Sequence, residues 1–434
     1  MAEVKAFRGL RFNLQTPQDL GMYTAPPYDM INDSMVNELY DLHPHNAVRI
    51  IQNKKEDSDK ENRDRHIRAA SILKSWMDEG VIKKDEKDSV YIYAQKFSAD
   101  INGVKGSFER IGVITLVKLV DFEEKVVFPH EYTLSGPKQD RYELLDASRT
   151  NTGQIFGLIP DEGDLFTTIK KMKEGRAPLG EFTDENEVVH SLYSCEDEQL
   201  IGELKKNVDS RSVLIADGHH RYETALRYYK EKGSDAYSHL MMTLVSMADP
   251  GLVIRPFHRM VNRAHAGEQV VMGQALKKYF DMKVIGKADT QEVTRALAQE
   301  VKDKEIVYWD CDSSELYLLK LNEEGEEFLK SVMPEHSDLW KHLEVSVINT
   351  IVINKILSLP LDGHVLHDVV EYVNDVSDAA QALGSADKYY GGFFIKPLSI
   401  QAINDIVKGG ERMPQKSTNF FPKLFSGLVF NKME

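Results

Sequence analysis

The densest group of reactive side chains lies in one short run, Asp217-Gly218-His219-His220-Arg221. An arginine guanidinium and a histidine N–H are donors suited to phosphate oxygens, and a glycine lets a ligand approach the backbone closely. A carboxylate beside phosphate is unfavourable unless it binds Mg²⁺ or accepts a proton. We therefore predict a phosphate and Mg²⁺ site here, with Asp217 as the metal ligand. The alternative is an ordinary capped helix with two incidental histidines.

The segments on both sides of this run must position it. Residues 213–216 form a short apolar run typical of a strand, whereas Tyr222, Ala225, Leu226 and Tyr229 recur at the spacing of a helix face. The pattern predicts a strand-to-helix turn. Such a turn directs unpaired backbone N–H groups and the positive end of the helix dipole at one point, where an anion can bind.

A second reactive cluster follows a β-rich region. Residues 90–93 and 111–117 are predicted strands, and Asn102-Gly103 is typical of a hairpin turn between them. The cluster lies around a Gly-Pro turn and supplies the candidates His130, Glu131, Lys138, Asp140 and Arg141. The alternative for its last three charged residues is a solvated first turn of a helix.

Three smaller segments carry further candidates. A proline-rich turn and a polar loop that leads into a strand-like run near the N-terminus contain Tyr28, Asp29, His43, Asn46 and Arg49. Near the C-terminus, Lys416, Ser417 and Thr418 lie in a proline-bounded loop whose charge and hydroxyls suit an anion. This loop lacks the preceding glycines of a Walker loop. The alternatives are a loop with a satisfied histidine and a plain surface turn.

Two other chemistries are poorly supported. The sequence has no Gly-x-Ser-x-Gly elbow, and neither Cys195 nor Cys311 stands beside a plausible base. His219, His220 and Glu223 bring metal-binding types together, but adjacent residues of a helix point about 100° apart and a third firm ligand is missing. Phosphate handling is therefore preferred over nucleophilic or zinc chemistry.

The whole chain has 434 residues, 42% of them hydrophobic, and a formal net charge of −15. An acidic chain lacks the basic surface that replaces counterions on DNA or RNA, so we expect no nucleic-acid partner. Two unrelated cysteines and the lack of a signal peptide or membrane span predict a cytoplasmic protein. The length predicts two or three domains, and a change to helix-rich, charged sequence places a boundary near residue 260.

Several of these segments together resemble the bacterial family catalogued as domain of unknown function 1015. The resemblance spans nearly the whole chain and is carried by Pro26-Pro27-Tyr28-Asp29, His43-Pro44 through Arg49, His130-Glu131 through Asp140-Arg141, Ile215 through Leu226, Asp249-Pro250-Gly251 and Met413 through Thr418. That family is grouped with the ParB/sulfiredoxin-like fold. The resemblance implies an α+β fold, with a ParB/sulfiredoxin-like nucleotide-binding core in residues 1–260. A helix-rich α/β region in residues 261–434 could complete the site.

Differences between this chain and the sequence patterns of the superfamily members indicate which of their activities it could have. Sulfiredoxins have a cysteine where this chain has His219, which argues against sulfinic-acid reduction. No helix-turn-helix or basic surface supports a ParB-like DNA-binding role. Free-serine kinases share an Asp-Gly-His-His-Arg-like motif, so the resemblance implies a phosphotransferase that uses Mg²⁺ and a nucleotide, ATP or ADP, on the hydroxyl of a small metabolite such as free serine. The alternative is a nucleotide-binding regulatory protein without phosphoryl transfer.

The prediction assigns a role to each candidate residue. Glu131 is the first candidate for the general base, Asp217 is the second, and His220 is a further catalytic candidate. The predicted phosphate and nucleotide ligands are Gly218, His219, His220, Arg221, Lys138, Arg141, Lys416, Ser417 and Thr418. The predicted substrate-binding residues are Tyr28, Asp29, His43, Asn46, Arg49 and His130.

Overall fold

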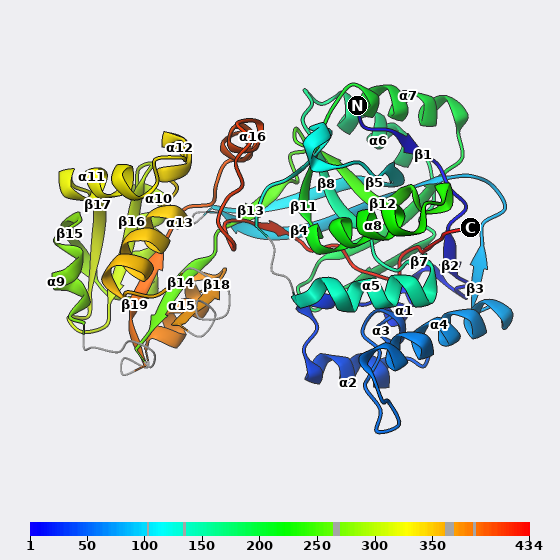
Figure 1. Cartoon of the computed structure of the whole chain (residues 1–434), viewed down its shortest axis with the longest axis horizontal. Coiled ribbons are helices and arrows are strands. Elements are labelled where there is room, and N and C mark those ends of the chain that lie inside the picture. Colours follow the sequence, from blue (N-terminus) through cyan, green and yellow to red (C-terminus); the bar gives the residue numbers. More distant parts are fainter. Residues whose placement is uncertain (102–103, 133–135, 264–269, 361–368, 385–387) are drawn as a thin grey trace.

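The computed structural model describes the chain except for residues 102–103, 133–135, 264–269, 361–368 and 385–387. It contains two large sheets, each accompanied by helices, which form two lobes side by side (Figure 1). Both termini lie on the larger lobe. The protein is thus a mixed α+β protein, as predicted.

The larger lobe is built on a nine-stranded sheet. Its strands are β1 (Val4–Lys5), β4 (Val90–Ile101), β5 (Val104–Lys118), β6 (Val127–Pro129), β8 (Ile155–Ile159), β9 (Gly180–Thr183), β10 (Val189–Cys195), β11 (Val213–Asp217) and β12 (His239–Ser246). The order is β6-β11-β8-β12-β5-β4-β10-β9, and β1 pairs with β5. β4 and β5 form the predicted antiparallel hairpin, although its turn lies outside the described residues. β6 and β11 are parallel, so the sheet is mixed.

Alternation along β4 explains how both faces of this sheet are covered. Val90, Ile92 and Ala94 pack in one apolar cluster, and Tyr91 and Tyr93 pack in another, because successive side chains of a strand point to opposite faces. The first cluster includes residues of α6 (Asp164–Lys173), α7 (Glu198–Asp209) and α8 (His219–Lys232). The second cluster includes Phe420, Leu424, Leu428 and Val429 of the C-terminal segment, so this segment covers the opposite face.

The helices that precede the hairpin lie at the bottom of the larger lobe in Figure 1: α1 (Leu20–Tyr23), α2 (Asp33–Leu42), α3 (Val48–Ile51) and the longer α4 (Asn62–Asp78). A two-stranded sheet of β2 (Leu10–Phe12) and β3 (Ile82–Lys84) accompanies them. Asn32 caps α2, because its side chain accepts the Met35 N–H at 2.9 Å. The prediction of a strand-like run at 48–51 is wrong: the Asn46 side chain accepts the Val48 N–H at 2.9 Å and begins a helical turn.

The smaller lobe contains a six-stranded sheet in the order β15-β17-β16-β19-β14-β18. Its strands are β14 (His258–Asn262), β15 (Phe280–Lys287), β16 (Glu305–Asp310), β17 (Glu315–Leu321), β18 (Val370–Val373) and β19 (Tyr389–Phe394). Every pairing is antiparallel, so this region is α+β where α/β was predicted. Its helices are α9 (Met272–Leu276), α10 (Thr290–Gln299), α11 (Glu323–Val332), α12 (Asp338–Lys341), α13 (Glu344–Val347), the π-helix η5 (Ile348–Ile356), α15 (Val376–Leu383) and α16 (Ile400–Lys408).

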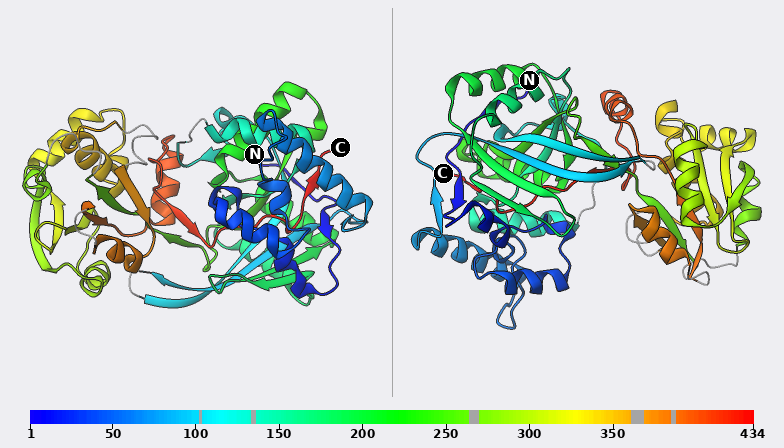
Figure 2. Two further views of the ribbon diagram at one scale, coloured as in Figure 1. Left: turned by 90° about the horizontal axis from the view of Figure 1, so that it is seen from below. Right: turned by 180° about the vertical axis from the view of Figure 1, so that it is seen from behind.

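After α16 the chain returns to the larger lobe, as the red segment in Figure 2 shows. In this C-terminal return, residues 409–434, strand β20 (Asn419–Phe421) pairs with β13 (Val253–Arg255), and β21 (Asn431–Lys432) pairs with β7 (Thr150–Asn151). The chain therefore crosses between the lobes twice. The predicted division into residues 1–260 and 261–434 stays a prediction.

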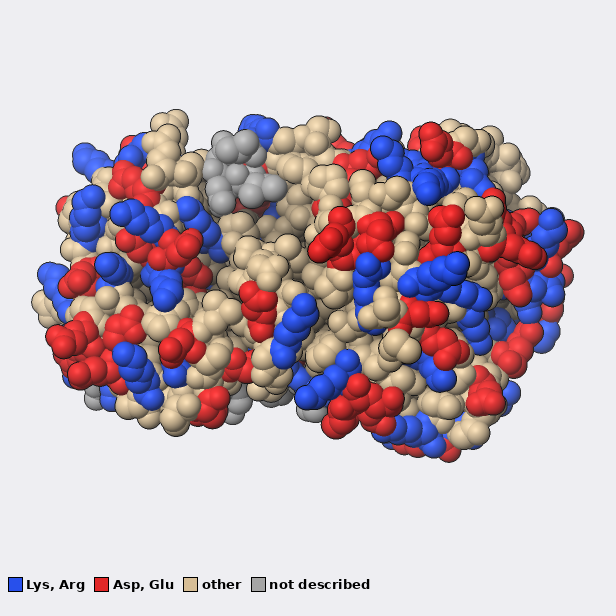
Figure 3. Space-filling view, turned by 90° about the horizontal axis from the view of Figure 1, so that it is seen from above, with Lys and Arg blue, Asp and Glu red and all other residues tan. Residues whose placement is uncertain are grey.

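Charged side chains of both signs are interspersed over the face of the molecule in Figure 3. Within the described part of the chain, no helix combines the length and the apolar character needed to cross a membrane. An anion would therefore have to bind at a local group of cations, since the formal net charge of the chain is −15.

Candidate functional site

Asp217 ends strand β11 and His219 begins helix α8, so the predicted strand-to-helix turn is confirmed. Gly218 lies between them with a φ of +97°, a left-handed conformation that a side chain would strain. A Cβ at this position would also lie 3.0 Å from the Arg221 guanidinium. The glycine thus leaves the first N–H groups of α8 uncovered beside an arginine, which is the arrangement that favours an anion.

A cleft of about 470 Å³ opens at this turn, a volume typical of small-molecule sites. Several distant parts of the chain meet there, among them the turn after Pro27, the end of β6 and the C-terminal return. The lining residues are Tyr28, Asp29, Gln52, His130, Glu131, Tyr132, Ala216, Asp217, Gly218, His219, His220, Arg221, Phe257, Gln415, Lys416, Thr418 and Lys423. The cleft therefore collects most of the predicted phosphate ligands and all three predicted catalytic residues.

Asp217 lies between two cations in the cleft. Its carboxylate is 3.1 Å from Lys423 Nζ and 3.5 Å from an Arg221 guanidinium nitrogen. Burial alone would raise the pKa of Asp217, but the charges of Lys423 and Arg221 outweigh it and hold the pKa well below its ordinary value. Asp217 is therefore ionised across the physiological pH range.

Glu131 is held in place by the C-terminal return. Its Oε1 accepts hydrogen bonds from the Ser417 N–H at 3.2 Å, the Thr418 N–H at 3.0 Å and the Thr418 hydroxyl at 3.0 Å. His130 Nε2 lies 3.3 Å from the same oxygen. Burial alone would raise the pKa of Glu131, but His130 and the hydrogen bonds lower it to about 2. A carboxylate with this pKa has little tendency to accept a proton near neutral pH.

Next to Glu131, the ring of the buried His130 packs against that of the half-buried His219, with ring centroids 4.8 Å apart. His130 Nδ1 donates to the Ile215 carbonyl at 2.5 Å, and His219 Nε2 accepts the His130 backbone N–H at 3.3 Å. Burial, and after it the charge of His130, lowers the pKa of His219 to about 3. His219 is therefore neutral near pH 7, while His220 lines the cleft beside it.

Tyr28 and Asp29 lie on the 3₁₀ turn η2 (Tyr28–Met30). The Tyr28 ring centroid is 4.1 Å from Arg141 Cζ and 5.9 Å from Arg221 Cζ. Asp29 has no ion pair or side-chain hydrogen bond with another side chain in the described part of the structure. Loss of solvent in the cleft and repulsion from Asp217 raise the pKa of Asp29, although Arg221 opposes this. The pKa of Asp29 is therefore raised, whereas the pKa values of Glu131 and Asp217 are lowered.

The predicted loop 416–418 contributes to the cleft with its two ends. Lys416 has a φ of +56°, and its Nζ lies 5.3 Å from the Phe257 ring centroid. Thr418 lines the cleft and donates its hydroxyl to Glu131. Ser417 is buried, and its hydroxyl donates to the Pro414 carbonyl at 2.6 Å, so its side chain stabilises the loop.

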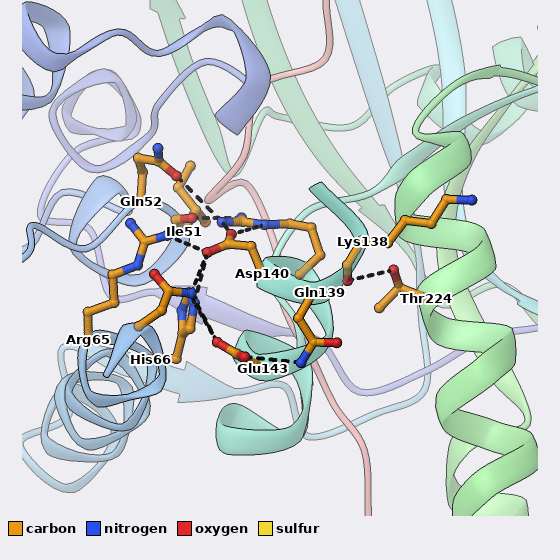
Figure 4. Close-up of polar contacts among 11 residues, drawn as sticks. Ile51, Gln52, Arg65, His66, Lys138, Gln139, Asp140, Glu143 and Thr224 are labelled. Atoms are coloured by element: carbon orange, nitrogen blue, oxygen red, sulfur yellow. Dashed lines mark hydrogen bonds and ion pairs between the residues drawn. The ribbon is translucent and has the colours of Figure 1, made fainter. Parts of the chain in front are cut away.

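Two predicted phosphate ligands on helix α5 (Gly136–Ser148) do not line the cleft. Figure 4 shows the network between α4 and α5 in which Arg141 is engaged: Arg141 donates to the Ile51 carbonyl at 2.8 Å and pairs with Asp140. The Lys138 side chain extends across α8, and its Nζ lies 2.6 Å from Glu223 (Figure 4). These cations have protein partners because α5 packs between α4 and α8.

Three predicted substrate-binding residues also lie outside the cleft lining. Asn46 is buried, and its amide donates to two backbone carbonyls at 2.8 Å. Arg49 donates to the Tyr40 carbonyl at 2.7 Å and lies over the Tyr40 ring. The His43 ring packs 4.3 Å from the Tyr23 ring. Their contacts stabilise the N-terminal loops, and the assigned substrate contacts stay predictions.

The sequence prediction omitted several lining residues, of which Lys423 is the most informative. Lys423 and Asp217 are 206 residues apart in the chain, and only the C-terminal return brings them together. A lysine directly after Pro422, close to the predicted anion-binding loop, is the sequence signal that could have identified it. Phe257 and Gln415 carry no comparable signal.

The described residues contain no group of three or more His, Cys, Asp or Glu side chains arranged to hold a metal ion. Mg²⁺ commonly binds through one or two carboxylates and takes its other ligands from phosphates and water. Asp217, which lines the cleft, fits that donor set. Cys195 and Cys311 are buried and do not line the cleft, so it offers no thiol for redox chemistry.

No curated protein matches the chain. Among solved structures, a variant of free serine kinase in complex with AMP is 13% identical, with a TM-score of 0.35 over 72% of this chain and 89% of that chain. A conserved hypothetical protein from Pyrococcus furiosus is 12% identical, with a TM-score of 0.32 over 72% and 93%. C-terminally truncated SbnI from Staphylococcus aureus is 14% identical, with a TM-score of 0.33 over 72% and 85%.

A family model described as a protein of unknown function (DUF1015) matches residues 4–346. The matched region includes the cleft residues from Tyr28 to Phe257, whereas Lys416 and Lys423 lie beyond it. Because the match covers well over half of the chain, the chain belongs to the DUF1015 family.

Proposed function

We propose that the cleft binds a nucleotide through its phosphates, together with Mg²⁺, and transfers a phosphoryl group to the hydroxyl of a small metabolite. The convergence of Arg221, Lys416, Lys423 and the start of α8 around Asp217 carries this proposal. Cations and free N–H groups match phosphate oxygens, and a carboxylate among them matches the Mg²⁺ that accompanies a nucleotide.

We also assign the nine-stranded sheet and α8 to the ParB/sulfiredoxin-like nucleotide-binding fold. The glycine turn between β11 and α8 supports this assignment, because such a turn opens a helix N-terminus to phosphate. The placement of His219, a neutral imidazole that lines the cleft, where a sulfiredoxin has cysteine favours phosphate chemistry over redox chemistry in this fold.

Each group of cleft residues has its own role in this proposal. Arg221, Lys416 and the first N–H groups of α8 hold the phosphates, and Lys423 keeps Asp217 ionised. Mg²⁺ bound at Asp217 would neutralise charge on the phosphate oxygens during transfer. His220 lines the same cleft as a hydrogen-bond donor. The assignment of Glu131 as general base stays a prediction, and its three accepted hydrogen bonds suit the support of loop 416–418.

The decisive experiment is a transfer assay on the full chain. Purified protein is incubated with Mg²⁺ and ATP, ADP or pyrophosphate, with L-serine as the first acceptor and then with other hydroxylated metabolites. Phosphorus NMR is expected to detect a new phosphate monoester that does not form in EDTA. Tight nucleotide binding without any transfer or hydrolysis would favour a regulatory protein instead, and neither binding nor transfer would refute both functions.

Nucleotide affinity provides a second prediction. Arg221→Ala is expected to weaken binding of the nucleotide by about 1.5–3 kcal/mol, about 10- to 150-fold in Kd, since a charged hydrogen bond to phosphate is lost. Calorimetric titration measures the change. Arg227→Ala is the matched control, because Arg227 lies on the same helix but pairs with Glu231 at 2.7 Å on the surface. Equal affinities of the two variants would refute the position of the site.

A further inference from the structure

We infer that Asp29 is the catalytic residue that accepts the proton of the substrate hydroxyl. This inference rests on the proposed function and adds the residue that performs its proton transfer. The described cleft lining contains three carboxylates, Asp29, Glu131 and Asp217. Their surroundings differ enough to separate their roles.

Glu131 and Asp217 are both engaged by fixed donors. Glu131 Oε1 accepts two backbone N–H groups and a hydroxyl from loop 416–418, and hydrogen bonds of this kind favour the ionised form of a carboxylate. Asp217 faces Lys423 at 3.1 Å and Arg221 at 3.5 Å. Both carboxylates are held as anions, with pKa values below their ordinary range. Each is therefore a weak proton acceptor.

Asp29 has the opposite surroundings. No other side chain of the described residues pairs with its carboxylate, and it lines the cleft with an exposed surface. The charged groups that act on it are Asp217, Arg221 and Lys423, and Tyr28 is its neighbour on the turn. Of the three cleft carboxylates, the accessible one that fixed donors do not engage is the best placed to accept a hydroxyl proton.

The backbone around Asp29 is held firmly. The Met30 N–H donates to the Pro27 carbonyl at 2.9 Å and closes the 3₁₀ turn. Tyr28 is fixed by Arg141, whose guanidinium Cζ lies 4.1 Å from the ring and which donates to the Ile51 carbonyl. Arg141, a predicted phosphate ligand, thus supports the turn that carries Asp29. A general base on such a rigid turn loses little entropy when substrate binds.

The nucleotide and the acceptor together supply all the atoms and electrons of the proposed transfer. The acceptor O–H bond breaks and its proton moves to a carboxylate oxygen of Asp29. The acceptor oxygen forms a bond to the terminal phosphorus, and the bond from that phosphorus to the bridging oxygen breaks. The electron pair of the broken bond stays on the nucleotide, so ATP leaves as ADP, or ADP as AMP. Asp29 then releases the proton to solvent through the open cleft.

The test compares Asp29→Asn, Asp29→Glu and the control Asp33→Asn, whose carboxylate is exposed at the start of α2. Transfer from ATP or ADP to L-serine, or to the acceptor found in the transfer assay, is measured from pH 4 to pH 8. We expect Asp29→Asn to lower kcat at least 100-fold at pH 7, with nucleotide Kd changed less than 3-fold. Asp29→Glu is expected to have a kcat at least tenfold higher than that of Asp29→Asn. Asp33→Asn is expected to have the kcat of the parent protein.

The pH profile separates catalysis from a structural role. In the parent protein kcat is expected to fall towards acidic pH as Asp29 becomes protonated, because only the ionised form of a carboxylate accepts a proton. Asp29→Asn should lack this acidic limb. If the parent transfers phosphate and Asp29→Asn keeps kcat within tenfold or keeps the limb, the role of Asp29 is refuted while the proposed function stands. If the parent transfers no phosphate to any acceptor, both are refuted.

Discussion

Replacing Asp217 with asparagine is expected to lower phosphoryl transfer by about a thousandfold, the largest loss of activity for a single substitution in the cleft. The variant removes the charge that faces Lys423 and Arg221 and the carboxylate assigned to Mg²⁺. Transition-state charge stabilised by a metal ion contributes several kcal/mol, and about 1.4 kcal/mol corresponds to a tenfold change in rate. The measurement is kcat at saturating nucleotide over a series of Mg²⁺ concentrations.

The measurement over a series of Mg²⁺ concentrations tests whether Asp217 itself binds the metal. If Asp217 binds the metal, half-saturation by Mg²⁺ should move to a higher concentration in Asp217→Asn. Glu223→Gln is the matched control: Glu223 is also a carboxylate paired with a lysine, Lys138, and it lies on α8 outside the cleft lining. This control is expected to keep both kcat and the Mg²⁺ requirement. An Asp217→Asn variant with the parent's kcat and Mg²⁺ dependence would contradict the assignment.

The centre of the site could be predicted from the sequence because its determinants are local. A β-branched apolar run, a glycine and a helical repeat follow one another within residues 213–229, and each specifies its own element. The same holds for the hairpin of β4 and β5, whose alternating pattern and turn residues are contiguous. In both places the structure has the predicted elements in the predicted order.

Other parts of the prediction depended on contacts that the sequence does not reveal. Arg141 and Lys138 have the residue types of phosphate ligands, but packing of α5 supplies them with partners on α4 and α8. Asn46 begins a helical turn at 48–51 through its side chain, which overrides the β-branched composition of that run. Lys423 reaches Asp217 only because the C-terminal return crosses the large sheet. Residue type alone therefore cannot separate a ligand from a structural cation.

The same limit applies to the three carboxylates. Glu131 follows a histidine in a cluster of reactive residues, and this made it the first candidate for the base. In the structure its donors come from a loop far along the chain: Ser417 lies 286 residues after Glu131, and Thr418 lies 287 residues after it. Asp29 is the least conspicuous of the three in the sequence. Its lack of side-chain partners becomes visible only in the folded cleft.

Replacing Glu131 with glutamine is expected to cost about 3 kcal/mol of unfolding free energy near pH 7, the largest loss of stability predicted for a cleft residue. The carboxylate has a pKa lowered from 4.5 to about 2 in the folded protein. A shift of this size corresponds to about 3 kcal/mol, since one pKa unit is worth about 1.4 kcal/mol. The amide of glutamine cannot provide the charge that Ser417, Thr418 and His130 face. Urea unfolding followed by tryptophan fluorescence measures the difference.

The pH dependence of this difference identifies its cause. Because the pKa of Glu131 is lowered on folding, its contribution is present in full above the unfolded pKa of about 4.5 and is lost as the pH falls towards 2. The stabilities of parent and variant should therefore converge below pH 4.5, while other acid-sensitive groups act equally on both proteins. A difference that stays constant between pH 7 and pH 3 would contradict an ionic role. Converging stabilities, with kcat per folded molecule within tenfold of the parent at pH 7, would identify Glu131 as the residue that fixes the C-terminal return over the cleft and leave proton transfer to Asp29.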